Sequence, residues 1–137
     1  MDTHFVSTKH AGGMAFNADV SGHLVSMDSS DEGQQKGASP KRLMLASLAG
    51  CTGIDVVSIL EKMKVPFSDF AIDIDATLSE SHPRIYNDVK ITYHIKLADN
   101  DRSKMEKAVK LSQDKYCGVS AMFRAFTKID IEIIYKL

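Results

Sequence analysis

Hydrophobic residues recur in three short stretches near the start of the chain, at residues 4–7, 13–20 and 23–27, several of which alternate with polar residues. Alternation with a period of two predicts β-strands that turn one face to a core. Ser21 and Gly22 separate the second and third stretches and predict the tip of a hairpin. Residues 28–39 are polar and contain glycine, without a hydrophobic pattern, and this predicts a loop.

A helical pattern begins after this loop. Ser39 can cap the free N–H groups of a helix, and Pro40 suits the first helical position because its missing N–H costs nothing there. Apolar or small residues then occupy every side of the segment up to Gly50, and the apolar pattern continues to Met63. A helix that is apolar all round is usually buried, so we expect a long central helix that ends before Pro66.

The rest of the chain predicts strands and helices in turn. Two long alternating segments, 69–79 and 85–98, are joined by a short link and read as an antiparallel pair. Asp101 or Ser103 can cap a second helix that runs to about Tyr116, and Gly118 precedes a short third helix. A final alternating strand covers 128–137. This order predicts an α+β fold in one domain, residues 1–137.

Composition narrows the classes of partner. The formal net charge is -1, so nothing indicates binding to nucleic acid or to an anionic membrane. No apolar run is expected to span a bilayer, and residues 1–13 lack the features of a signal peptide. We therefore expect a cytoplasmic protein with no membrane partner.

The chain has two cysteines, Cys51 and Cys117, and four interpretations of them are open. Free cysteines are often simply buried. A structural disulfide is disfavoured in a reducing compartment, and a metal site lacks a CxxC motif or histidines at ligand spacing. A redox-active pair is the fourth interpretation. Two features support it: Cys117 lies where a helix begins, a position that stabilises a thiolate, and glycines flank Cys51, which lets another group approach its sulfur.

Residues near Cys51 bear on its reactivity. Gly50 and Gly53 flank it within the helix, where each costs about 1 kcal/mol relative to alanine, so we expect another backbone or a ligand to approach closely. Asp55, one turn after Cys51, could lie beside the thiol and raise its pKa. Alternatively, Asp55 pairs with a Lys or Arg elsewhere.

Two segments carry a resemblance to a known family. The stretch ASPKRLMLASLAGCTGIDVVSILEKM resembles the central helix of the OsmC/Ohr family, the osmotically inducible and organic-hydroperoxide-resistance proteins. The stretch KYCGVSAM resembles the family's second cysteine segment. The resemblance implies an intertwined α+β homodimer whose active sites lie at the subunit interface. It also implies thiol-based reduction of hydroperoxides without a cofactor or metal.

By this resemblance Cys51 is the peroxidatic cysteine and Cys117 the resolving one. The Cys51 thiolate would become a sulfenic acid, Cys117 would form a disulfide with it, and a dithiol reductant, in the best-known members a lipoylated protein, would restore both thiols.

The chain departs from the family pattern around the thiolate. Peroxidase members have a glutamate just after the helix-start proline and an arginine from the N-terminal region, whereas this chain has Lys41 and no arginine before Arg42. Arg42 on the helix is one possible supporting residue. His82 and Arg84, in the turn between the two long strands, are either solvent-exposed turn residues or reach the cysteine of the partner subunit in place of the missing arginine. The competing hypotheses are a protein of this fold that binds a small apolar or anionic ligand, and a non-catalytic stress-related dimer.

Overall fold

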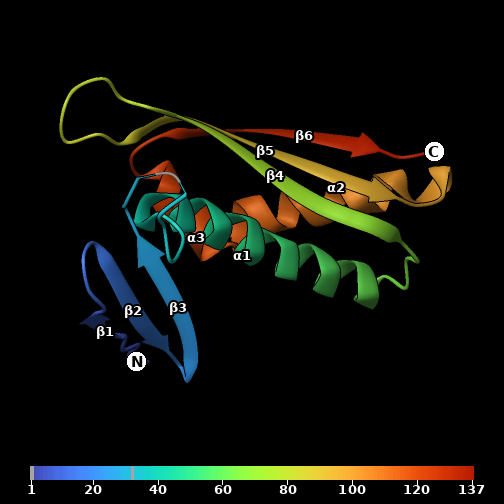
Figure 1. Ribbon diagram of the computed structural model, residues 1–137. Coiled ribbons are helices and arrows are strands. Elements are labelled where there is room, and N and C mark those ends of the chain that lie inside the picture. The colour runs from blue at the N-terminus through green and yellow to red at the C-terminus, as the bar shows by residue number, and fades with distance from the viewer. Residues whose placement is uncertain (1, 32) are drawn as a thin grey trace. The chain divides into compact units, whose positions relative to one another are not determined.

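The structure is a computed structural model that describes residues 2–31 and 33–137. The chain divides into two compact units, Met1–Leu45 and Ala46–Leu137. The elements are labelled in Figure 1, and each unit is described by itself. The model is α+β, as the sequence predicts.

The N-terminal unit contains an antiparallel sheet of strands β1 (Ser7–His10), β2 (Ala15–Val20) and β3 (His23–Asp28), in that order. The expected hairpin is confirmed, because Val20 pairs with His23 across a two-residue turn. Ser21 and Gly22 both have positive φ, 54° and 85°, as the tightest hairpin turns require. Strand β1 begins at Ser7 rather than at His4, because Ser7 pairs with Asp19 and β2 ends one residue later.

The polar segment after β3 is organised by one carboxylate. Asp28 is 2% exposed and accepts hydrogen bonds from the Ser30 hydroxyl at 2.6 Å and from the backbone N–H groups of Ser30 and Lys36. These bonds, led by the Ser30 hydroxyl, lower the pKa of Asp28. Hydrogen bonds to the buried Asp28 carboxylate therefore hold the segment that the sequence predicts as a loop.

Helix α1 (Pro40–Lys62) begins as the sequence predicts. The backbone N–H of Arg42 donates to the Ser39 hydroxyl at 3.1 Å, which is the expected cap. By length and composition alone α1 could cross a membrane, contrary to the sequence expectation. The sequence predicts that α1 is buried all round, but within the described chain it is buried along one stripe only, where the buried positions repeat every fourth residue: Leu48, Thr52, Val56 and Leu60.

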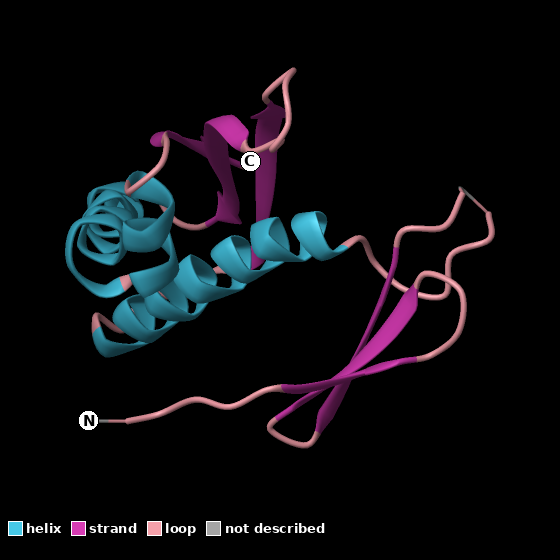
Figure 2. Ribbon diagram, turned by 90° about the vertical axis from the view of Figure 1, so that its left-hand side faces the viewer, coloured by secondary structure: helices cyan, strands magenta, loops and turns pink. Residues whose placement is uncertain are grey.

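The C-terminal unit has a sheet with helices on one face (Figures 1 and 2). Strands β4 (Ser68–Leu78) and β5 (Tyr86–Lys96) are antiparallel, as predicted, and β6 (Lys128–Tyr135) pairs in parallel with β5. The inner face of β5 is fully apolar apart from one hydroxyl: Val89, Ile91, Tyr93 and Ile95 are each at most 1% exposed. Its outer face carries charged groups such as Lys90, which pairs with Glu132 at 2.7 Å.

The second helical segment changes geometry before it ends. A short 3-10 turn (η1, Asp99–Asp101) leads into α2 (Arg102–Leu111), and a π-helical turn (η2, Ser112–Tyr116) follows. Asp101 lies at the N-cap position, but its side chain makes no capping bond, so that part of the prediction is wrong. Cys117 then caps α3 (Gly118–Arg124), where the predicted third helix is confirmed.

Candidate redox site

The two cysteines meet between α1 and the start of α3. Cys51 is half-buried, Cys117 is 3% exposed, and both are free thiols. Cys51 lies near enough to Cys117 to raise its pKa. The fold thus brings together two residues that lie on different helices and that the sequence singles out as a pair.

The environment of Cys117 holds it as a thiol. Burial raises the pKa of Cys117, and the nearby Cys51 adds to this rise. Ser120 opposes the rise, because its backbone N–H donates to the Cys117 sulfur at 3.3 Å. The Ser120 hydroxyl also acts to lower this pKa. It is fully buried and makes no hydrogen bond with any described residue.

A buried polar network lies next to the pair. The Thr52 hydroxyl is 2.7 Å from both the Tyr93 hydroxyl and the Ser112 hydroxyl. Ser112 in turn donates to Asp55 Oδ2 at 2.9 Å. The amide of Gln113 donates to Tyr93 at 3.0 Å and to Thr52 at 3.2 Å. Side-chain hydrogen bonds therefore join three elements, α1, β5 and η2, inside an apolar core.

Arg124 closes the network at its other end. Its guanidinium donates to the backbone oxygen and to the side-chain oxygen Oε1 of Gln113, both at 2.7 Å. Burial raises the pKa of Tyr93, the charge of Cys117 adds to that rise, and Arg124 opposes it. Tyr93 is therefore close enough to both groups to sense their charges. Sequence reasoning missed Arg124, although it lies on the helix that Cys117 begins.

The π-helical turn η2 connects the polar network to Cys117 through a backbone hydrogen bond. Its residues Ser112 and Gln113 are buried, and the backbone N–H of Cys117 donates to the Ser112 carbonyl at 2.7 Å. Turns of this kind occur often at functional sites. The polar run SQD directly before KYC is a signal that could have drawn attention to them, whereas Thr52 and Tyr93 look like ordinary core positions.

The other predicted site residues lie elsewhere. Asp55 is half-buried, and its hydrogen-bond partner is the Ser112 hydroxyl rather than a Lys or Arg. Arg84 bonds within its own turn, where Nε donates to the Ser79 carbonyl at 3.0 Å. His82 and Arg42 are exposed. Whether His82 or Arg84 serves a partner subunit stays a prediction. Within residues 2–31 and 33–137, His, Cys, Asp and Glu form no group of three or more suited to a metal ion.

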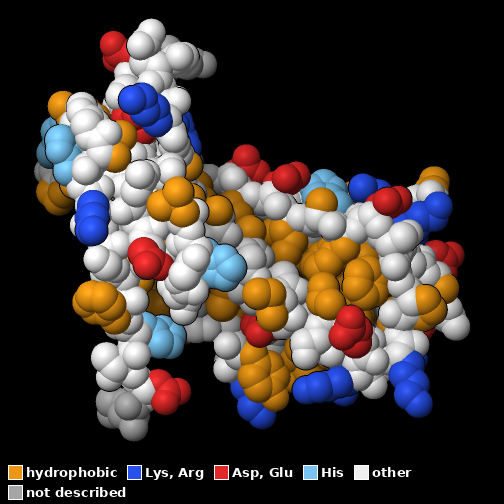
Figure 3. Space-filling view, turned by 60° about the horizontal axis from the view of Figure 1, so that its bottom comes forward, with side chains coloured by type: hydrophobic (Ala, Val, Ile, Leu, Met, Phe, Trp, Pro, Cys, Tyr) orange, Lys and Arg blue, Asp and Glu red, His pale blue; other side chains and the backbone are white. Residues whose placement is uncertain are grey.

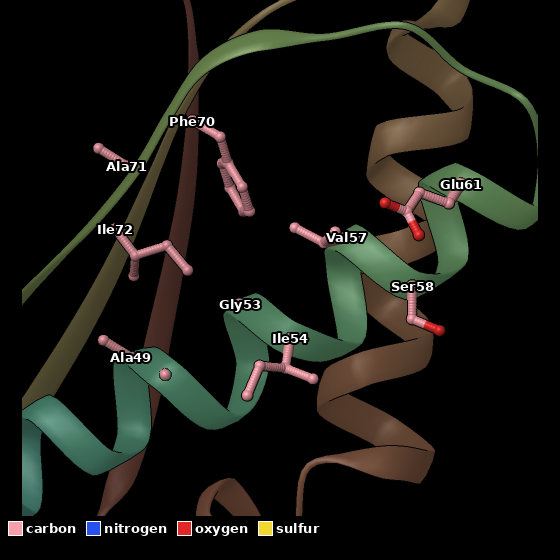
Figure 4. Close-up of a pocket in the computed structure, with 10 residues that line it drawn as sticks. Ala49, Gly53, Ile54, Val57, Ser58, Glu61, Phe70, Ala71 and Ile72 are labelled. Carbon is pink, nitrogen blue, oxygen red and sulfur yellow. The ribbon is translucent and has the colours of Figure 1, made fainter.

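An apolar groove occupies a different side of α1 (Figure 4). It has a volume of about 650 Å³ between α1 and β4, and its lining is mainly apolar: Ala49, Gly50, Gly53, Ile54, Val57, Ser58, Glu61, Phe70, Ala71 and Ile72. Figure 3 shows hydrophobic side chains gathered at the surface between charged ones. Ile54 in this groove is 72% exposed.

The glycines belong to this groove and not to the thiol. A Cβ on Gly50 would meet nothing within 4 Å, and one on Gly53 would lie 3.1 Å from Ile72 Cδ1. A close approach is therefore found at Gly53 only, and the Ile72 side chain makes it, rather than the backbone or ligand that the sequence predicts. At Gly50 the predicted approach by a backbone does not occur within the described chain.

Comparison with known proteins identifies the family. Residues 33–132 match the family model described as OsmC-like protein. The chain is 31% identical to Protein YhfA of Escherichia coli K12 over 110 residues, which is 80% of this chain and 81% of that protein. A hypothetical protein from Aquifex aeolicus VF5 has a TM-score of 0.88 at 30% identity and covers 99% of this chain and 98% of its own.

More distant structures share the fold alone. The organic hydroperoxide resistance protein OhrB of Bacillus subtilis has a TM-score of 0.62 at 21% identity, with 98% of each chain covered. Because the family model matches most of the chain and YhfA is 31% identical to it, the chain belongs to the OsmC family.

Proposed function

We propose that this protein is a thiol-dependent peroxidase that reduces organic hydroperoxides or hydrogen peroxide and serves in defence against oxidative stress. The observation that carries this proposal is that the fold brings two free thiols, Cys51 and Cys117, near enough for Cys51 to raise the pKa of Cys117. Two neighbouring thiols can form a disulfide once one of them is oxidised. Membership of the OsmC family supports the same chemistry.

Exposure favours Cys51 as the attacking residue, because it is half-buried whereas Cys117 is buried. The Cys51 thiolate attacks one peroxide oxygen, the O–O bond breaks, and the alkoxide takes a proton and leaves as an alcohol. Cys51 is then a sulfenic acid. The Cys117 sulfur attacks Cys51, the S–S bond forms, and hydroxide leaves and becomes water. A dithiol, by family likeness a lipoylated protein, then reduces the disulfide.

The proposal includes assembly and location. OsmC/Ohr proteins are typically homodimers, and we expect the same here in the cytoplasm, with residues 1–137 acting as one OsmC-like domain. Large apolar side chains at the surface support a dimer: Leu24 is 70% exposed and Ile54 is 72% exposed. The Aquifex aeolicus structure covers 99% of this chain, which supports treating it as one domain. Light scattering of the purified protein gives the oligomeric state directly.

The test of the proposed activity uses two matched variants. Wild-type protein should consume an organic hydroperoxide with loss of both thiols per turnover. Cys51→Ser should abolish consumption. Cys117→Ser should retain a single turnover and accumulate a sulfenic acid at Cys51, detected by mass spectrometry after trapping with dimedone. An unchanged rate in Cys51→Ser would rule the mechanism out.

A second candidate function is the binding of a small apolar ligand without turnover. The groove of about 650 Å³ between α1 and β4 favours it, because its lining is mainly apolar and such cavities suit small ligands. Binding would survive Cys51→Ser and be lost in Gly50→Phe, which fills the groove. If wild-type protein does not raise the fluorescence of a polarity-sensitive dye, this candidate is excluded.

A further inference from the structure

Ser120, in the first turn of α3, carries a hydroxyl group that has no partner in the folded chain. Its side chain is fully buried, and its Oγ makes no hydrogen bond with any residue in 2–31 or 33–137. A buried hydroxyl without a partner costs free energy, so such groups are few in folded proteins. Where one is kept, a redox or catalytic step can supply the missing partner.

The same residue already contacts the sulfur of Cys117. The backbone N–H of Ser120 donates to Cys117 Sγ at 3.3 Å. The Ser120 Oγ is three bonds from that nitrogen, so rotation about the single Cα–Cβ bond decides whether the hydroxyl also faces the sulfur. A protonated thiol is a weak hydrogen-bond acceptor, whereas a charged acceptor binds a donor about twice as strongly as a neutral one. The hydroxyl therefore has little to bond to beside the thiol and a good acceptor beside the thiolate.

The sulfur of Cys117 carries negative charge twice in a thiol–disulfide cycle. It attacks Cys51 as a thiolate when the disulfide forms, and it leaves as a thiolate when a reductant attacks the more exposed Cys51 sulfur. Cys117 is 3% exposed, so water does little to stabilise this charge. The titratable groups that interact with it are Cys51 from α1 and Tyr93 from β5, and neither is a cation. A neutral donor is what this position requires.

We propose that the Ser120 hydroxyl, together with the Ser120 N–H group, stabilises the Cys117 thiolate while it exists. In disulfide formation the Cys117 thiol gives its proton to water, the hydroxyl donates to the sulfur, and the sulfur attacks Cys51 and expels hydroxide. In reduction a dithiol attacks Cys51, the S–S bond breaks, and its electron pair stays on Cys117 beside the hydroxyl until a proton returns. This inference rests on the proposed function. It makes Ser120 a catalytic residue, because its N–H contacts the reacting sulfur.

The test needs no peroxide and so stands apart from the peroxidase assay. Closure is followed with an aromatic disulfide that releases a coloured thiolate. It reacts first with half-buried Cys51, and Cys117 then displaces a second equivalent in a step that does not depend on reagent concentration. Opening is followed on protein oxidised with diamide, which takes up two electrons and two protons, and then reduced with dithiothreitol. Equilibration with dithiothreitol gives the reduction potential of the pair. Cys117→Ser removes the second phase of closure.

Ser120→Ala removes the hydroxyl and keeps the N–H group. Loss of a bond to a charged sulfur raises the pKa of the thiol by about one unit, which leaves about a tenth of the thiolate. Each remaining thiolate is about threefold more nucleophilic, so closure near neutral pH should slow about threefold. Opening should slow by the same factor, since Cys117 becomes a poorer leaving group. The reduction potential should not change, because neither the thiol nor the disulfide uses the hydroxyl.

Two controls separate this role from a structural one. The reduced Ser120→Ala protein should resist urea as well as wild type does, because the hydroxyl has no partner to lose. Val119→Ala, in the same turn, should leave both rates unchanged.

Unchanged rates in Ser120→Ala overturn the proposal. A shifted reduction potential also overturns it, because the hydroxyl would then act on the thiol or the disulfide. So does a wild-type protein whose cysteines diamide does not join. If both rates slow as described but hydroperoxide is not consumed, only the peroxidase function fails. If hydroperoxide is consumed and the rates do not change, only the role of Ser120 fails.

Discussion

Two sides of α1, the one that faces α2 and the one that faces the groove, differ in how many of their groups have partners within the chain. On the first side, Thr52 and Asp55 join a network in which each hydroxyl has a partner. On the second side, Gly50 faces empty space and Ile54 is 72% exposed. One helix therefore combines a buried, hydrogen-bonded polar side with an apolar side that the rest of the described C-terminal unit leaves open.

The two sides of α1 constrain the sequence in different ways. A buried polar group without its partner costs free energy, so the network tolerates few substitutions. The open groove imposes no such cost on the single chain, and its residues are free to suit a ligand or a second subunit. Substitutions on the two sides of α1 should therefore differ sharply in their effect on folding.

The largest effect is expected at Thr52. Thr52→Val should lower the free energy of unfolding by about 2–3 kcal/mol, because Tyr93, Ser112 and Gln113 would each lose a partner inside the core. Urea denaturation followed by circular dichroism measures the change. Ile54→Thr on the groove side should cost under about 0.5 kcal/mol. Equal costs for the two variants would contradict the contrast between the sides.

The fold was more predictable than the site for physical reasons. Period-two alternation identified β4 and β5, and Ser39 with Pro40 marked the start of α1, because local propensity and burial agree there. Strand β1 was misplaced because its limits depend on the length of β2. The resemblance found both cysteines. The hydrogen-bond network could not be predicted, because the hydroxyl groups of Thr52 and Tyr93 bond to residues that are distant in sequence.

A smaller effect is expected from the raised pKa of Cys117. Unfolded Cys117 should ionise near its ordinary value of 9.0, while the buried thiol stays protonated. The native state then binds more protons, so its stability falls as pH rises above about 9, by at most about 1.4 kcal/mol per pH unit. Unfolding midpoints measured at a series of alkaline pH values should decline more steeply for wild type than for Cys117→Ala. Parallel declines would mean that the core does not hold this proton.

The smallest effect is expected on the groove side, at Gly50. Because an added Cβ meets nothing within 4 Å, Gly50→Ala should raise the free energy of unfolding by up to about 1 kcal/mol through helix propensity alone. Gly53→Ala should gain less, since its Cβ would press on Ile72 Cδ1 at 3.1 Å. Thermal unfolding at low protein concentration measures both. A destabilised Gly50→Ala would mean that the groove is filled in solution and that glycine at this position makes room for the occupant.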